Sequence, residues 1–346
     1  MIISIFASIW CQNIGDELIL KNEIKMLEEE YWKDTKFIVF SYDYKDPFFE
    51  KSNITYREYF PIWIKKASNF FKNVSNFFSF FSVIWKSDLI VIGWWWIIYD
   101  NELQSVKNPL DSWIFRVKTV KFFMKKVRFF AVWLNIKNES NYKKVKQIFS
   151  NAWKITVRDN YSSNLLNTLW IESTIVRDPV FNELTNIDER SYLLKSVEST
   201  VFSCNDLDDI DLEWKKIAIA FRKWYLSDRS SNLSLQLEEW KLNELINFIL
   251  KKWWEVILLP HSFHKTDDLA NDYNFLSKYL RVNEKIRIIN SMEEVYKKYI
   301  YKEMDICLAM RYHSIVLSQV YWIPYIWVSY SIKTDELLED IKKTLK

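Results

Sequence analysis

Glycine is almost missing from this sequence. Soluble proteins contain about 7% glycine, so a chain of 346 residues should hold roughly two dozen, yet this one has 2 glycines and 18 tryptophans. Glycine supplies the left-handed backbone conformation that tight turns and many helix ends require. A fold of this length without glycine would lack most of its tight turns, so the shortage needs a systematic cause.

Several tryptophans stand where glycine is expected. Trp170, Trp253 and Trp322 each follow a helix-like run, at the position where helices commonly end on a left-handed glycine. We hypothesise that the gene comes from a lineage that reads UGA as glycine, and that these codons are rendered here as tryptophan. The alternative is a tryptophan-rich, non-catalytic glycan-binding protein whose indoles stack on sugars. A true tryptophan fits two helix-like stretches, around Trp113 and Trp240.

Other shortages exclude several classes of protein. The three cysteines are far apart and match no CxxC or metal-ligand spacing, so reduced thiols in a cytosolic protein are the simplest interpretation. The 48 basic and 45 acidic residues give a net charge of +3, and no lysine or arginine block is long enough for a nucleic-acid track. We therefore expect no metal site and no nucleic-acid partner.

Long apolar runs are also lacking. The N-terminal segment "MIISIFASIW" has no positive region before it, so it reads as a first strand and not as a signal peptide. The stretch from Asn69 is broken by Lys72 and several Asn and Ser residues, which favours an amphipathic helix packed on a sheet over a membrane-surface helix. These features predict a cytoplasmic protein with at most a peripheral association at the inner face of the membrane.

What the sequence does contain is an alternation of short apolar runs with longer segments of helical period. This pattern predicts an α/β fold with parallel sheets. We expect two doubly wound Rossmann-like domains facing a cleft, similar to the GT-B glycosyltransferase architecture. The expected ranges are an acceptor-side domain at 1–185, an acidic linker at 186–213, a second domain at 214–332 and a terminal helix at 333–346.

Ligands of open α/β sheets bind outside the carboxyl ends of the strands, so candidate residues should follow strands. In the first half, Asn13, Gly15, Asp16 and Glu17 follow the first strand and open a helix. The two carboxylates cap that helix or contact a sugar hydroxyl. The third strand ends in a loop that becomes glycine-rich under the recoding hypothesis and exposes backbone amides to a ligand: Gly93, Trp94, Trp95 and Trp96.

In the second half, Arg311, His313 and Ser314 lie where a buried strand ends and a helix begins, a favourable place for an anion. Arginine matches phosphate or carboxylate with two parallel hydrogen bonds, and histidine moves protons near neutral pH. Three further residues follow other strands of this half: Arg222, His261 and His264. All three histidines of the chain therefore fall at strand ends.

With these tryptophans read as glycine, several segments resemble the polysaccharide pyruvyl transferase family: "NIGDE", the glycine-rich loop, "TVRDNYSS", "RDPVF", "LPHSFH" and "MRYHSIVLSQVYGIPYIGVSY". The resemblance covers residues 1 to about 335. It implies transfer of the enolpyruvyl group of phosphoenolpyruvate to a lipid-linked or nucleotide-linked glycan, with formation of a pyruvate ketal and without a further cofactor.

The resemblance assigns roles to the candidate residues. Arg311 and Arg222 would hold the two anionic groups of phosphoenolpyruvate, His313 or His264 would supply a proton, and Asp16 or Glu17 would contact the acceptor hydroxyls. Arg158, Asp159 and Asp178 match family motifs but read as structural residues. The alternative function is a nucleotide-sugar-dependent GT-B glycosyltransferase. The acceptor sugar, the bridged hydroxyls and the oligomeric state stay open.

Overall fold

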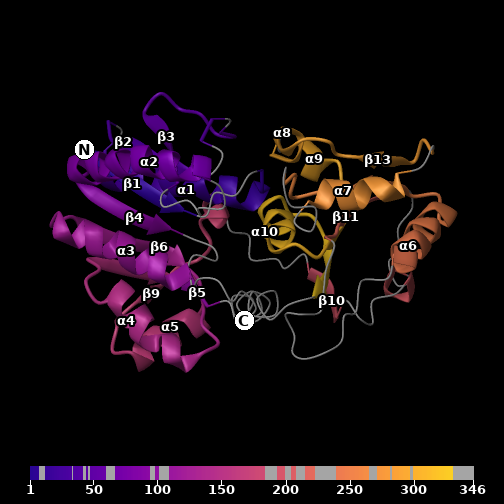
Figure 1. Cartoon of the computed structure of the whole chain (residues 1–346). Helices are drawn as coiled ribbons and strands as arrows, with labels where there is room; N and C mark the ends of the chain where they lie inside the picture. Colours follow the sequence, from indigo (N-terminus) through magenta and orange to yellow (C-terminus); the bar gives the residue numbers. More distant parts are fainter. Residues whose placement is uncertain are drawn as a thin grey trace. The chain divides into compact units, whose positions relative to one another are not determined.

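The computed structural model (Figure 1) describes residues 1–7, 12–32, 34–41, 44–45, 47–59, 67–93, 98–100, 109–183, 193–198, 204–207, 215–222, 239–264, 271–280, 283–296 and 299–329. The chain forms two compact units. The first comprises Met1–Trp10 and Asp16–Pro179, and the second comprises Cys11–Gly15 and Val180–Lys346.

The first unit is built on a seven-stranded parallel sheet in the order β3-β2-β1-β4-β6-β8-β9. Its strands are β1 (Ile2–Ala7), β2 (Lys36–Ser41), β3 (Ile54–Glu58), β4 (Leu89–Gly93), β6 (Lys126–Val132), β8 (Lys154–Val157) and β9 (Thr174–Ile175). Its helices are α1 (Ile14–Tyr31), α2 (Ala67–Lys86), α3 (Pro109–Phe122), α4 (Tyr142–Phe149) and α5 (Asn160–Thr168). A short parallel pair, β5 (Ile98–Tyr99) and β7 (Leu134–Asn135), lies beside them.

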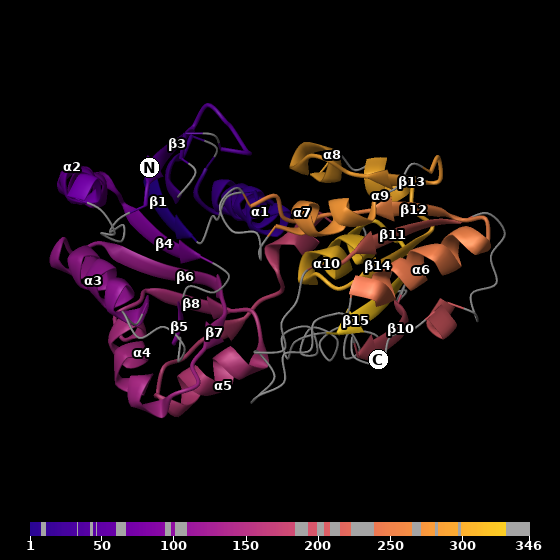
Figure 2. The same ribbon diagram turned by 45° about the vertical axis from the view of Figure 1, so that its right-hand side comes forward.

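The second unit contains a six-stranded parallel sheet in the order β10-β15-β14-β11-β12-β13 (Figure 2). Its strands are β10 (Leu193–Glu198), β11 (Lys216–Ala220), β12 (Glu255–Leu258), β13 (Ile286–Ile288), β14 (Ile306–Ala309) and β15 (Tyr325–Ser329). Its helices are α6 (Glu239–Lys251), α7 (Asp272–Leu276), α8 (Met292–Tyr296), α9 (Tyr299–Lys302) and α10 (Tyr312–Val320).

Both sheets are doubly wound. The chain places β2 and β3 on one side of β1 and the later strands on the other, and it repeats this scheme around β11. Central strands are apolar throughout because helices cover both faces of a parallel sheet: every residue of β4 and of β14 is buried. The winding reverses between β1 and β4 in the first unit and between β11 and β14 in the second. Ligands of such sheets bind at these reversal points.

Part of the predicted linker is a strand. Residues 193–198 form β10, which pairs in parallel with β15 at the edge of the second sheet. The acidic composition of the surrounding segment concealed this strand, whose pairing partner lies more than a hundred residues away. The strands at 54–58 and 98–99 were not predicted from the sequence either. The terminal helix expected at 333–346 lies outside the described residues.

The predicted amphipathic helix from Asn69 is confirmed as part of α2, with Phe80 and Ile84 fully buried. Within the described ranges, every helix is too short or too polar to cross a lipid bilayer.

Four tryptophans among the described residues have a positive φ. One of them, Trp32, follows α1, and the other three occupy the helix ends that their positions in the sequence predicted. Trp170, Trp253 and Trp322 have φ angles of 62°, 64° and 63°. In each case the next residue donates a backbone hydrogen bond across the last helical turn, which is the Schellman arrangement: Ile171 to Leu166 (3.0 Å), Trp254 to Ile249 (3.3 Å) and Ile323 to Ser318 (2.8 Å). Glycine is the residue that adopts this conformation without steric cost.

The indoles at these three positions contribute little packing. Trp170 is 91% exposed, Trp253 71% and Trp322 41%, whereas Trp113 within α3 is 3% exposed and belongs to the core. Met124 also has a positive φ at the end of α3, so the geometry alone does not require a recoded codon. The combination of a strained backbone and an exposed indole at the ends of α5, α6 and α10 is what the recoding hypothesis expects.

We therefore expect glycine at these positions to stabilise the chain. Each of Trp170→Gly, Trp253→Gly and Trp322→Gly should raise the free energy of unfolding by about 1 kcal/mol, because a left-handed L-residue costs about that much. Trp113→Gly is the matched control and should lower it by about 3 kcal/mol or more. Urea denaturation measures both effects. Loss of stability in all four variants would contradict the hypothesis, as would UGG codons at the three helix ends.

Candidate functional site

Most of the predicted site residues of the second unit lie at the carboxyl ends of three neighbouring strands. β11 lies between β12 and β14, and all three strands are parallel. Arg222 follows β11, His261 follows β12 and Arg311 follows β14. Arg222 and Arg311 thus stand on the two sides of the reversal point of this sheet, the position at which doubly wound sheets bind ligands.

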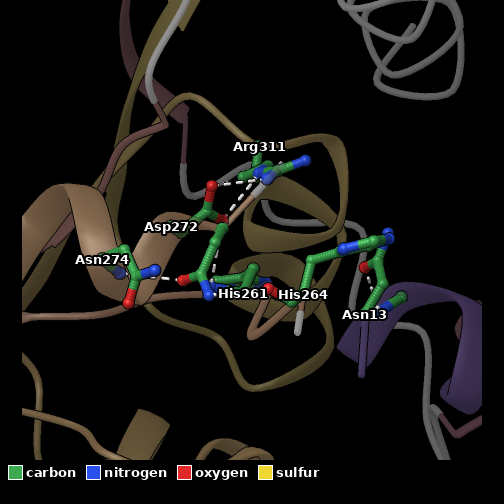
Figure 3. Close-up of polar contacts among 8 residues, drawn as sticks. Asn13, His261, His264, Asp272, Asn274 and Arg311 are labelled. Atoms are coloured by element: carbon green, nitrogen blue, oxygen red, sulfur yellow. Dashed lines mark hydrogen bonds and ion pairs between the residues drawn. The ribbon is translucent and has the colours of Figure 1, made fainter. Parts of the chain in front are cut away.

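Arg311 is held by a carboxylate that the sequence interpretation missed. Its Nε donates to Oδ2 of Asp272 at 2.8 Å, and its Nη2 donates to Oδ1 of the same side chain (Figure 3). The Asp272 side chain is 1% exposed and that of Arg311 is 14% exposed. Two parallel bonds of this kind fix the plane of the guanidinium as well as its position. Arg311 is therefore oriented before any ligand arrives.

Asp272 also anchors the loop after β12. Its Oδ2 accepts the backbone N–H of His261 at 3.2 Å. The preceding residue, Asn271, caps α7 by accepting the N–H of Asn274 at 2.8 Å, and its amide donates to the carbonyl of His264 at 2.8 Å. The pair "ND" before a short helix reads as an ordinary cap, so the sequence offered no signal that Asp272 faces an arginine.

His261 is turned into the interior of the second unit. Its ring is 1% exposed, and its Nε2 lies 2.8 Å from the hydroxyl of Tyr301 in α9. Burial lowers the pKa of His261 well below its usual 6.5, and the nearby positive charges of Arg311 and His313 lower it further. His261 is consequently neutral at physiological pH, which makes it a poor source of protons compared with a charged imidazole.

The segment that follows β1 contributes to the second unit. Ile14 donates its N–H to the carbonyl of His261 at 3.0 Å, and Phe263 donates to the carbonyl of Gln12 at 2.9 Å. Asn13 forms an isolated bridge with Ser262, and its Oδ1 accepts the N–H of Gly15 at 3.1 Å. Asn13 therefore belongs to the same local structure as His261, although the two residues are 248 positions apart in the sequence.

Gly15 is required by the ring of His313. A Cβ atom at this position would lie 1.9 Å from Nδ1 of His313, closer than real atoms approach. His313 is 6% exposed and stands in the first turn of α10. Glycine at position 15 thus lets the first connection of the chain pack directly on this imidazole.

Other predicted residues have different surroundings. Ser314 donates its hydroxyl to the carbonyl of Arg311 at 2.6 Å, a bond within the start of α10. His264 and Arg222 are buried and half-buried respectively at the same strand ends. Asp16 and Glu17 are buried in the first turn of α1 in the first unit. Burial of Tyr56 raises the pKa of its hydroxyl, and the nearby charge of Glu17 raises it further. Trp94, Trp95 and Trp96 lie outside the described residues.

The reversal point of the first sheet holds a second unpredicted carboxyl group. Glu23 of α1 is fully buried, and a Cβ on Gly93 would lie 3.0 Å from its Oε1. Among the described residues, none donates a hydrogen bond to either Glu23 oxygen. Burial raises the pKa of Glu23 well above its usual value, and Arg128 opposes this shift only in part. Glu23 is therefore buried against the strand end that precedes the predicted loop, in surroundings that favour its neutral form.

The residues that were interpreted as structural have structural contacts. Arg158 donates to Oδ2 of Asp178 at 2.9 Å, and both side chains are buried. Asp159 is the N-cap of α5 and accepts the N–H of Ser162 at 2.6 Å. These contacts join β8 and α5 to the segment that ends the first unit.

The clash at Gly15 makes a specific prediction. Gly15→Ala should lower the free energy of unfolding by about 2 kcal/mol, since the added methyl must displace His313 or the backbone. The imidazole NMR signals of His313 should shift, and with three histidines in the chain each ring can be assigned. Gly93→Ala is the matched control, because its methyl meets the end of a flexible carboxylate. Equal destabilisation by both variants, with His313 signals unmoved, would contradict this packing.

Comparison with known proteins places these features in a family. The sequence model of the family described as "Polysaccharide pyruvyl transferase" matches residues 13–332. No curated protein is similar enough in sequence to count as a match.

Solved structures share the fold. The chain is similar to a UDP-GlcNAc 2-epimerase from Methanocaldococcus jannaschii, with a TM-score of 0.50, 11% identity and coverage of 100% of this chain and 93% of that one. It is also similar to another UDP-N-acetylglucosamine 2-epimerase, with a TM-score of 0.51, 8% identity and coverage of 99% and 89%. At these identities the likeness shows the fold alone, which is the predicted arrangement of two Rossmann-like domains of GT-B type.

Proposed function

Because this chain belongs to the polysaccharide pyruvyl transferase family, we propose that it moves the enolpyruvyl group of phosphoenolpyruvate onto a sugar of a cell-surface polysaccharide or its precursor. The product is a pyruvate ketal, and phosphate is released. The observation that supports this best is the pair of arginines, Arg222 and Arg311, on the two sides of the reversal point of the second sheet.

Phosphoenolpyruvate carries a phosphate and a carboxylate, so a complementary site needs two cationic groups. Arg311 enters the reaction with its guanidinium plane already fixed by Asp272, which reduces the entropy lost when an anion binds. Arg222 supplies the second positive charge from the neighbouring strand end. The first turn of α10 adds backbone N–H groups that favour an anion.

The reaction balances with one proton donor and one acceptor. His313 or His264 gives a proton to the vinyl carbon C3, which becomes a methyl group and leaves C2 electrophilic. A sugar hydroxyl forms the first bond to C2, the C2–O bond to phosphate breaks, and a second hydroxyl closes the ketal. The two sugar hydroxyls each lose a proton. One of these protons restores the proton that the histidine gave to C3, and the other leaves on the released phosphate.

The acceptor belongs to the first unit in this proposal. Asp16 or Glu17 at the start of α1 would contact its hydroxyls, and a lipid-linked or nucleotide-linked glycan is the substrate class. Glu23, which is buried beside Gly93, would keep the end of β4 in place. No further cofactor enters the proposed chemistry.

The test is phosphate release from phosphoenolpyruvate with a lipid-linked or nucleotide-linked hexosamine acceptor. Arg311→Lys should lower kcat/KM for phosphoenolpyruvate about 100-fold, since lysine keeps the charge but loses the two parallel bonds. Lysine is preferable to alanine because alanine leaves Asp272 buried without its partner, which costs about 3 kcal/mol or more and endangers folding.

Arg287→Lys is the matched control. Arg287 also pairs with a carboxylate, that of Glu303, but it lies within β13 away from the reversal point. Its replacement should leave kcat/KM within about twofold, as for most surface changes. Unchanged phosphate release by Arg311→Lys would refute the assignment of Arg311, and release of nucleotide instead of phosphate would favour the glycosyltransferase alternative.

A further inference from the structure

The first unit carries an exposed aromatic surface that its proposed chemistry does not use. We call it the aromatic patch and define it by the exposed apolar residues of α2, α3 and the turn after α3: Val74, Phe77, Phe78, Trp85, Phe115, Phe122 and Met124. Phe78 is 68% exposed and Phe122 77% exposed. Singly exposed apolar residues are normal, but a contiguous group of this size marks an interaction surface.

The patch is continuous across the two helices. The ring of Phe81 lies 5.8 Å from that of Phe123, and Phe123 lies 5.8 Å from Trp85 and 5.2 Å from Phe122. Phe77 contacts both Phe78 and Phe81. Helix α2 thus has two apolar faces, one packed on the sheet through Phe80 and Ile84 and the other open to solvent.

Lysines lie beside the patch, and its two helical stretches contain no acidic residue. One carboxylate reaches α2 from β3, where Glu58 accepts a hydrogen bond from the side-chain amide of Asn76 at 3.0 Å. Neither residues 67–87 nor residues 112–126 contain Asp or Glu. Lys118 lies between Phe115 and Phe122 on one face of α3, because positions three and four apart share a helix face. Three further lysines stand at the ends of the two helices: Lys86, Lys121 and Lys125, of which Lys125 lies 6.0 Å from the ring of Trp85.

The flanking carboxylates are already engaged. Asp111 at the start of α3 pairs with Lys144 at 2.7 Å, and Asp88 after α2 accepts the N–H of Ile2 at 2.7 Å. The whole chain is close to neutral, with a net charge of +3, so the basic character is a local property of this surface.

We propose that the aromatic patch docks the protein on a lipid bilayer that contains anionic lipids. Phenylalanine rings enter the boundary between headgroups and acyl chains, and the surrounding lysines contact the negative headgroups. The proposal deepens the proposed function, since it fits an acceptor glycan carried on a lipid. The proposal depends on phenylalanines, so it holds whether the tryptophan codons are read as tryptophan or as glycine.

Vesicle flotation of the full-length protein tests the proposal without any substrate. The protein should float with vesicles of phosphatidylcholine mixed with phosphatidylglycerol and much less with phosphatidylcholine alone. Raising the salt concentration should weaken binding, because screening shortens the reach of the lysine charges. A wild-type protein that ignores anionic vesicles overturns the proposal.

Two double variants separate the contributions. Phe78→Ser with Phe122→Ser should weaken vesicle binding by at least tenfold, the order expected for removing two buried aromatic groups. Lys118→Glu with Lys121→Glu should weaken it by about fivefold or more per residue, and only with anionic vesicles. The matched controls are exposed residues of the second unit, Leu280→Ser and Lys251→Glu, which should bind as the wild type does.

Circular dichroism and thermal unfolding confirm that each variant is folded. Equal vesicle binding by the wild type and the double phenylalanine variant overturns the proposal. A second result also overturns it: the wild type does not bind vesicles, and it forms a dimer in size-exclusion chromatography that the double phenylalanine variant does not form. The patch is then an interface between two copies of the chain. Since no phosphoenolpyruvate is present, vesicle binding and phosphate release succeed or fail separately.

Discussion

The ion pair between Arg311 and Asp272 fixes the strand ends on which the site of the second unit depends. The same carboxylate accepts the His261 backbone N–H, and the His261 carbonyl accepts the N–H of Ile14. This series of bonds runs from the start of α10 through the loop after β12 to the connection after β1. A buried carboxylate with a fixed arginine is costly to separate. The candidate anion site is therefore oriented before ligand binds, which suits the proposed reaction of a small substrate with two anionic groups.

Backbone conformation gives a second constraint, independent of the site. Left-handed helix ends at Trp170, Trp253 and Trp322 keep the geometry that glycine allows, and the indoles are left largely in solvent. Trp327 differs, because it is fully buried in β15 and its indole N–H has no hydrogen-bond acceptor among the described residues. A buried N–H without an acceptor costs about 1–3 kcal/mol. The strained backbone at the three exposed tryptophans and the unbonded indole N–H of buried Trp327 both indicate positions that suit a smaller residue.

The sequence predicted the parallel α/β architecture and most strands because buried central strands are continuous apolar runs. It also predicted that Arg222, His261, Arg311 and His313 would follow strands, since that depends only on local pattern. It did not reveal Asp272 or Glu23, because their importance comes from partners that the topology brings near. Nor did it reveal that Gly15 packs on His313, or that β10 extends the second sheet, for the same reason. Local chemistry could be read from the sequence, whereas pairing across long separations required the fold.

The proposed reaction requires that phosphoenolpyruvate is protonated at C3 and attacked at C2. The most direct measurement is to run the reaction in deuterated water with an acceptor glycan and to examine the product by NMR and mass spectrometry. Protonation at C3 and attack at C2 predict a ketal whose methyl group has gained one deuterium, together with free phosphate. A glycosylated product without a new methyl group, or a ketal methyl without deuterium, would contradict it.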